Sequence, residues 1–125
     1  MKITPVMVVE AVEPALAFWV DRIGFTIAGQ VPEGDRIGFA MLTKDGTELM
    51  LQSVESVHKD IPEFTPRGKP EGTVLYIEVP DLEEVKAKLG DYPLAMLERT
   101  TFYGMREIGV HAPGGHLVMF AAKAG

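Results

Sequence analysis

Residues 36–52, RIGFAMLTKDGTELMLQ, and residues 106–120, REIGVHAPGGHLVMF, decide the fold of this 125-residue chain. Each stretch holds two apolar runs separated by a short turn, KDG at 44–46 and PGG at 113–115. Glycine-containing turns between apolar runs are typical of β-hairpins. The two stretches therefore predict two similar hairpins, one in each half of the chain.

The similarity of the two halves extends beyond the hairpins. When Gly46 is aligned with Gly115, Met50 falls on Met119, and further upstream Val9 falls on Val79. This pattern predicts a repeated unit of one strand, one helix and three strands, with an offset of about seventy residues. The expected strands are residues 3–9, 25–30, 36–43 and 47–52 in the first half, and 73–79, 94–100, 105–111 and 116–121 in the second half.

Each half also predicts one helix after its first strand. Pro14 suits the first helical position, and Asp81 is an N-cap residue, whereas Gly90 is typical of the end of a helix. Apolar faces at helical spacing are expected from Leu16, Trp19, Val20 and Ile23 in the first helix, and from Leu82, Val85 and Leu89 in the second.

The predicted fold class is α+β, and the length of the chain suits one domain, residues 1–125. This domain consists of two βαβββ repeats, about 1–52 and 73–125, joined by a connector at 53–72. The connector contains three prolines and many charged residues. We expect it to be a surface segment that crosses between the repeats or covers a site.

The composition excludes several classes of function. Eighteen acidic residues against twelve basic ones give a net charge of −6, which provides no general attraction to nucleic acid or to anionic membranes. The chain has no cysteine, so disulfides, thiolate nucleophiles and cysteine-based zinc sites are ruled out. No transmembrane segment or signal peptide is visible, and we expect a cytoplasmic protein with neither a nucleic acid nor a membrane as partner.

Three segments resemble the vicinal oxygen chelate superfamily, which includes glyoxalase I, bleomycin-resistance proteins and extradiol dioxygenases. They are residues 9–24, where AFWVDRIGF at 17–25 resembles the end of the family's first helix, residues 76–89, and residues 103–120, which contain the second hairpin. The resemblance implies that the two βαβββ modules lie edge to edge in an open, cupped, eight-stranded mixed sheet. It also implies a homodimer in which two chains share the cups.

The resemblance further implies where a metal ion is held in metalloenzymes of this superfamily. The matching positions are Thr4 and Val74 on the first strands, and Met50 and Met119 on the last strands. Zn, Ni, Mn and Fe(II) prefer imidazole or carboxylate ligands, which none of these residues provides. We therefore expect no metal and no cofactor. Metal-dependent glyoxalase, thiol-transfer and ring-cleavage activities are argued against.

Strand alternation predicts which side chains line the cup. If Met50 and Met119 point inward, then Glu48, Gln52, Tyr76 and Glu78 do so as well. A mostly apolar wall with a few polar groups is typical of a small-molecule pocket. The alternative is that these residues form an interface or a solvated rim without a ligand.

Residues 102–106, FYGMR, are the second candidate for ligand binding. Phe102 and Tyr103 could stack on a planar ligand, and Arg106 could bind an anionic or carbonyl group. The alternative is a packing tyrosine and an arginine that is paired with a neighbouring carboxylate.

Three functions are compatible with these residues. The first is a metal-free homodimer that binds and sequesters a small molecule, planar or cationic, as bleomycin-resistance proteins do. The second is a metal-independent isomerase or lyase, with Glu78 or Glu48 as general base and Tyr76 or Tyr103 as donor. The third is a structural dimer whose cavity is filled by its own side chains or by another protein.

Overall fold

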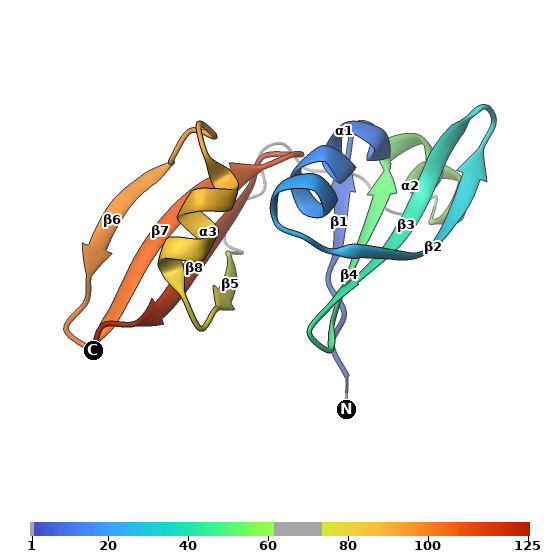
Figure 1. Cartoon of the computed structure of the whole chain (residues 1–125). Helices are drawn as coiled ribbons and strands as arrows, with labels where there is room; N and C mark the ends of the chain where they lie inside the picture. The colour runs from blue at the N-terminus through green and yellow to red at the C-terminus, as the bar shows by residue number, and fades with distance from the viewer. Residues whose placement is uncertain (1, 62–73) are drawn as a thin grey trace. The chain divides into compact units, whose positions relative to one another are not determined.

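The computed structural model describes residues 2–61 and 74–125. The chain divides into two compact units, unit 1 (Met1–Gly68) and unit 2 (Lys69–Gly125). Hydrogen bonding places the eight strands in two four-stranded mixed sheets, one in each unit (Figure 1). The predicted α+β class with two βαβββ modules is confirmed.

Both units have the same strand order. Unit 1 contains β1 (Val6–Val9), α1 (Val12–Leu16), the π-helix η1 (Ala17–Arg22), β2 (Thr26–Glu33), β3 (Arg36–Lys44), β4 (Thr47–Ser53) and α2 (Val54–Asp60), with the order β1-β4-β3-β2. Unit 2 contains β5 (Leu75–Glu78), α3 (Leu82–Leu89), β6 (Met96–Thr100), β7 (Met105–Ala112) and β8 (His116–Lys123), with the order β5-β8-β7-β6. In each unit the first strand runs parallel to the last, and the other pairs are antiparallel.

The two hairpin turns explain why the repeat is visible in the sequence. Asp45 and Gly46 have φ values of 51° and 77°, and Gly114 and Gly115 have φ values of 92° and 82°. Two successive residues with positive φ give a turn whose twist matches that of the flanking strands, and glycine adopts this conformation at low cost. Both predicted hairpins are therefore present.

The first helix differs from the prediction. After α1 the backbone widens into η1, where the N–H of Ile23 donates to the carbonyl oxygen of Phe18, five residues earlier, at 3.0 Å. Of the predicted apolar face, Trp19 and Ile23 are buried as predicted, whereas Leu16 and Val20 are only partly buried. The remaining buried side chains of this segment are Val12, Ala15 and Phe18.

The first part of the predicted connector at 53–72 contains the end of β4 and the helix α2. Ser53 ends β4 and caps α2, since its hydroxyl oxygen accepts a hydrogen bond from the Ser56 N–H at 3.1 Å. Val57 is buried, which anchors α2 to its unit. Residues 62–72 of the predicted connector lie outside the described residues.

Each sheet has one face that packs against a helix. In unit 1 the face toward α1 buries Met7, Val9, Ala40, Leu42, Leu49 and Leu51, and in unit 2 the face toward α3 buries Ile108, Val110, Val118 and Phe120. This period-two burial confirms the predicted alternation of the hairpin strands. The opposite face of each sheet is called the second face below.

Within residues 2–61 and 74–125, no helix combines the length and apolar character that crossing a membrane requires.

Candidate functional site

The second face of unit 2 combines methionines, a tyrosine and carboxylates. Cα pairing places Tyr76 beside Met119, Glu78 beside Ala121, and Glu107 also beside Ala121. Paired residues on neighbouring strands project from the same face of a sheet. By this register the second face carries Tyr76 and Glu78 from β5, Leu117, Met119 and Ala121 from β8, Met105, Glu107 and Gly109 from β7, and Met96 from β6.

Glu107 forms the centre of this face. Its side chain is 0% exposed, and its Oε2 atom accepts hydrogen bonds from the hydroxyls of Tyr76 at 2.6 Å and Tyr103 at 2.8 Å. Its Oε1 atom accepts from Nε of Arg99 at 3.1 Å, and Nη2 of Arg99 lies 3.0 Å away. A carboxylate is stable away from water only when its oxygens are paired in this way. We call Tyr76, Arg99, Tyr103 and Glu107 the Glu107 cluster.

The cluster shifts the pKa values of Glu107, Tyr76 and Arg99. The hydrogen bond from Tyr76 lowers the pKa of Glu107, with further lowering by Tyr103 and Arg99, although burial opposes it. The hydrogen bond to Glu107 raises the pKa of Tyr76 to about 12, and burial and neighbouring charges act in the same direction. The hydrogen bond to Glu107 likewise raises the pKa of Arg99. At neutral pH Glu107 is therefore a carboxylate, Arg99 a guanidinium and Tyr76 a protonated phenol.

Glu107 and Arg99 are the functional candidates that sequence reasoning missed. Turn geometry could have found Glu107, because the hairpin pairs Gly109 with Met119 and Glu107 with Ala121. Since Met119 was already assigned to the cup, strand alternation then assigns Glu107 to the same face. Arg99 has no comparable signal, because β6 pairs with β7 through an irregular register.

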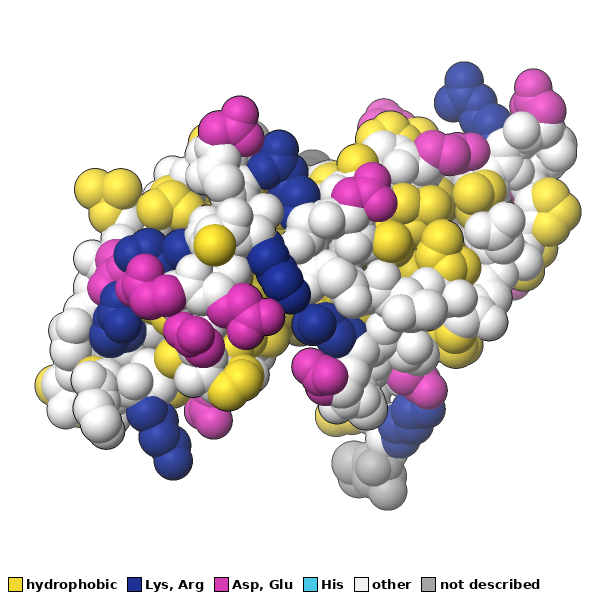
Figure 2. Space-filling model, in the orientation of Figure 1, with side chains coloured by type: hydrophobic (Ala, Val, Ile, Leu, Met, Phe, Trp, Pro, Cys, Tyr) yellow, Lys and Arg dark blue, Asp and Glu magenta, His cyan; other side chains and the backbone are white. Residues whose placement is uncertain are grey.

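The structure places Arg106 on the other face of its strand. Arg106 alternates with Glu107 along β7, and its Nη2 atom lies 2.6 Å from Oε1 of Glu83 on α3 and 2.7 Å from Oε2 of Glu98 on β6. This is the carboxylate-paired arrangement that the sequence left as the alternative. Hydrogen bonds from Arg106 and Lys86 lower the pKa values of Glu83 and Glu98. Figure 2 shows charged side chains of both signs gathered over α3.

The two aromatic residues between β6 and β7 have different surroundings. Phe102 is 100% exposed, whereas Tyr103 is 52% exposed and belongs to the Glu107 cluster. Their rings meet edge to face, with centroids 5.1 Å apart. Tyr76, the other tyrosine of the cluster, is 47% exposed. Two tyrosine rings are therefore held at their hydroxyl ends while half of each residue remains accessible.

In unit 1 the second face contains Met50, which pairs with Val6 on β1 and with Met41 on β3. Gln52 lies on the same face but is buried, because its Nε2 atom donates to Oγ of Ser56 on α2 at 3.1 Å. Phe39, which pairs with Gln52, also lies on this face.

The two carboxylates that the sequence offered as general bases have different environments. Glu48 forms an ion pair of 2.6 Å with Lys2, and it is partly exposed. Glu78 is exposed on β5, and no hydrogen-bond or ion-pair partner for its side chain is found among the described residues. Of the two, only Glu78 shares a face with the Glu107 cluster.

The positions that a metal ion would need hold other kinds of side chain. Thr4 and Val74 lie just before β1 and β5, and the strand neighbours of Met50 and Met119 are Val6 and Tyr76. Thioethers, aliphatic groups and a phenol bound to Glu107 do not fit a hard divalent ion. In the described part of the chain, no group of three His, Asp or Glu side chains is arranged to hold a metal.

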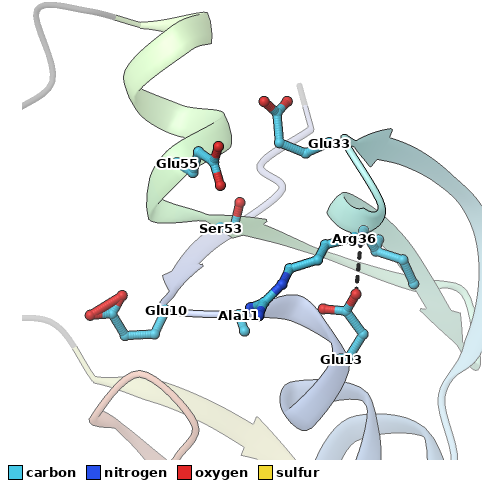
Figure 3. Close-up of a pocket in the computed structure, with 8 residues that line it drawn as sticks. Glu10, Ala11, Glu13, Glu33, Arg36, Ser53 and Glu55 are labelled. Atoms are coloured by element: carbon cyan, nitrogen blue, oxygen red, sulfur yellow. Dashed lines mark hydrogen bonds between the residues drawn. The ribbon is translucent and has the colours of Figure 1, made fainter.

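A small polar hollow of about 30 Å³ lies in unit 1 where α1, α2 and the β2–β3 hairpin meet (Figure 3). Figure 3 shows Arg36 extending across it toward Ala11, while Oε2 of Glu13 accepts a hydrogen bond from the Ile37 N–H at 2.8 Å. That hydrogen bond lowers the pKa of Glu13. A space of this size holds about one water molecule, so it is too small for an organic ligand.

Comparison with known proteins agrees with this architecture. The Glyoxalase/Bleomycin resistance protein/Dioxygenase superfamily profile matches residues 3–120, which covers both units. The chain belongs to this superfamily. No curated protein matches the chain at a significant level.

Solved structures similar to this superfamily member span nearly its whole length. A bleomycin-binding protein from Streptomyces verticillus, in complex with copper(II)-bleomycin, is 26% identical with a TM-score of 0.63, and the match covers 98% of this chain and 95% of that chain. TioX from Micromonospora sp. ML1 is 17% identical with a TM-score of 0.76, covering 98% of each chain. A lactoylglutathione lyase from Agrobacterium tumefaciens is 15% identical with a TM-score of 0.74, covering 98% of this chain and 92% of that chain. The last two similarities show the fold alone.

Proposed function

We propose that this superfamily member is a metal-independent binding protein that sequesters a small organic molecule on the second faces of its sheets. The Glu107 cluster is the observation that carries the proposal. It holds two half-exposed tyrosine residues in fixed positions beside the methionines of unit 2. Rings that are already ordered lose little conformational entropy when a ligand binds.

The composition of the second faces supports a small molecule as the ligand. The second face of unit 1 carries the partly exposed side chains of Met41, Met50 and Phe39, and the second face of unit 2 carries Met105, partly exposed, and Met119, which is 7% exposed. Methionine adapts its shape to flat or irregular ligands. The few polar groups on these faces, chiefly Tyr76 and Glu78, provide orientation. The similarity to a bleomycin-binding protein supports the same class of function.

Binding without a metal ion is part of the proposal. The side chains near the metal positions of the superfamily are thioethers, aliphatic groups and the phenol of Tyr76. The hydroxyl proton of Tyr76 is donated to Glu107, and the pKa of this phenol is raised to about 12. A metal-bound phenolate would require the loss of this proton, which the cluster opposes.

A homodimer that shares its ligand between two protomers is the assembly we propose. Val6 and Tyr76, one on each second face, are each about half exposed, and Phe102 is fully exposed. Apolar and aromatic side chains left accessible in this way are suited to an interface or a ligand. Light scattering at micromolar concentration should give twice the 13.7 kDa of one chain.

A thermal-shift screen with planar organic compounds tests the binding function. We expect a subset of compounds to raise the melting temperature of the wild type and to lose this effect in Tyr76→Ala and Tyr103→Ala variants. Glu84→Gln, a change on the exposed side of α3, is the matched control and should respond as the wild type does. Stoichiometric Zn, Ni, Mn or Fe in the purified protein would contradict metal independence.

A further inference from the structure

We infer that the second face of unit 2 selects a cationic ligand group bearing N–H donors, which binds between the hydroxyl oxygen of Tyr76 and the carboxylate of Glu78. This inference rests on the proposed function and adds the chemical class of the ligand. It follows from the direction of the hydrogen bonds in the Glu107 cluster and from the position of Glu78.

The direction of the Tyr76 hydrogen bond is fixed by its partner. The hydroxyl of Tyr76 lies 2.6 Å from Oε2 of Glu107, and a carboxylate only accepts hydrogen bonds. The single hydroxyl proton of Tyr76 therefore points to Glu107. Toward a ligand, the Tyr76 oxygen can therefore only accept a hydrogen bond, so the ligand must carry a hydrogen-bond donor.

Glu107 itself is not available to a ligand. Its side chain is fully buried, Oε2 accepts from Tyr76 and Tyr103, and Oε1 is bound by Arg99. Glu107 thus acts as a positioning residue that sets the polarity of Tyr76. It neither takes a proton from a ligand nor gives one to it.

Glu78 supplies the second acceptor. It follows Tyr76 by two residues on β5, so the Cα atoms of the two residues are about 7 Å apart along the strand and both side chains project from the same face. Its carboxylate is exposed and has no ion-pair partner among residues 2–61 and 74–125. An amidinium or a similar group with several N–H donors is complementary to a lone pair and a carboxylate on one face.

Arg99 is the group that could make this face prefer an anion to a cation. It is the one cation of the Glu107 cluster, and its side chain is 55% exposed. Its Nε and Nη2 atoms are directed to Oε1 of Glu107, and it also interacts with the hydroxyl of Tyr103. Arg99 is thus engaged on the Oε1 side of the cluster, whereas Tyr76 lies on the Oε2 side. Binding of an anion at Arg99 is the alternative that the experiment must detect.

Calorimetric titration of the full chain with three matched probes tests the inference. Naphthalene-2-carboxamidine is a planar cation with N–H donors, the 2-naphthyl trimethylammonium ion is a cation without them, and 2-naphthoate is a planar anion. We expect the amidine to bind about tenfold more tightly than the trimethylammonium ion, because a hydrogen bond involving a charged group is worth this much. The naphthoate should bind most weakly.

Two variants locate the effect. Tyr76→Phe keeps the ring but removes the lone pair and the hydrogen bond to Glu107. Both cations should therefore bind more weakly, but the amidine should also lose its advantage over the trimethylammonium ion. Glu78→Gln should weaken both cations. Tighter binding of naphthoate, or equal binding of the two cations by the wild type, overturns the inference whether or not a variant folds. Failure of all three probes also overturns it, whereas the binding function itself is decided by the thermal-shift screen.

Discussion

The hydroxyl of Tyr76 on β5 lies 2.6 Å from the carboxylate of Glu107 on β7, although β8 separates these two strands in the sheet. The bond therefore spans β8 and passes over the second face of unit 2. It joins residues 31 positions apart in the sequence. This hydrogen bond holds the ring of Tyr76 in place and uses the proton of its hydroxyl. It also supplies one of the hydrogen bonds that the buried carboxylate of Glu107 requires.

The Tyr76 hydroxyl should ionise at unusually high pH. Its pKa is raised from about 10 to about 12 in the folded protein by the hydrogen bond to Glu107. The neutral phenol thus stabilises the fold fully below pH 10, and this contribution is lost as the pH rises from 10 toward 12. The difference in unfolding free energy between the wild type and Tyr76→Phe, measured with urea, should shrink over this range. A tyrosinate absorbance step for Tyr76 near pH 10 would show that the bond is absent.

Gly109 on the second face of unit 2 should not tolerate a side chain. A Cβ atom at this position would lie 3.0 Å from Sδ of Met119 and 3.1 Å from Cβ of Met96. We expect Gly109→Ala to destabilise the protein by about 1–3 kcal/mol through overpacking, measured by chemical denaturation. Gly29→Ala is the matched control, because nothing lies within 4 Å of its Cβ position. Equal effects of the two substitutions would argue against close packing on the second face.

Arg99 and Arg106 should differ in their influence on ligand binding. Arg106→Gln removes ion pairs with Glu83 and Glu98 on the face toward α3, so the dissociation constant of a ligand should stay within about twofold of the wild type. Arg99→Gln removes the cation bound to the buried Glu107, so the two tyrosines should lose their fixed positions and affinity should fall. Calorimetric titration measures the loss of affinity in each variant. A larger loss for Arg106→Gln than for Arg99→Gln would show that Arg106 belongs to the binding site.

Ser53 should stabilise α2 as its N-cap. Its side chain accepts a hydrogen bond from the Ser56 N–H at 3.1 Å, so Ser53→Ala should cost about 1 kcal/mol of unfolding free energy. Ser53→Gly should cost only a few tenths of a kcal/mol, because glycine is a tolerated N-cap residue. Denaturant titrations of both variants provide the comparison. A loss for alanine no larger than for glycine would mean that the capping bond contributes nothing.

The fold was predictable because its decisive features are local. The turns at Asp45-Gly46 and Gly114-Gly115 require positive φ values, which leave a clear mark in the sequence. The π-helix was not predictable, because the hydrogen bond from Ile23 to Phe18 leaves the spacing of apolar residues unchanged while rotating the face that they form. The helix α2 was missed because its short run of polar residues resembles a surface loop.

The candidate site was predictable only in part. Strand alternation predicted that Tyr76 shares a face with Met119, and the register pairs these two residues. The role of Tyr76, Met50 and Met119 in ligand binding stays a prediction. The role of Glu107 depends on contacts with side chains from β5, β6 and the turn before β7. These three segments are far apart in the sequence or joined by an irregular register, so no residue spacing predicts that their side chains meet. The expectation for Arg106 ignored its alternation with Glu107 along β7.

The most direct test of the account is a methyl spectrum of the protein labelled with ¹³C-methyl methionine. Met50 and Met119 lie on the second faces, whereas Met7 lies on the face toward α1. Met7 and Met119 are equally buried, at 6% and 7% exposed, so Met7 serves as an internal control that differs from Met119 in its face. A planar compound selected by thermal shift should move the resonances of Met50 or Met119 in a saturable manner and leave that of Met7 unchanged. Shifts confined to Met7, or no methyl shift with any stabilising compound, would contradict binding on the second faces.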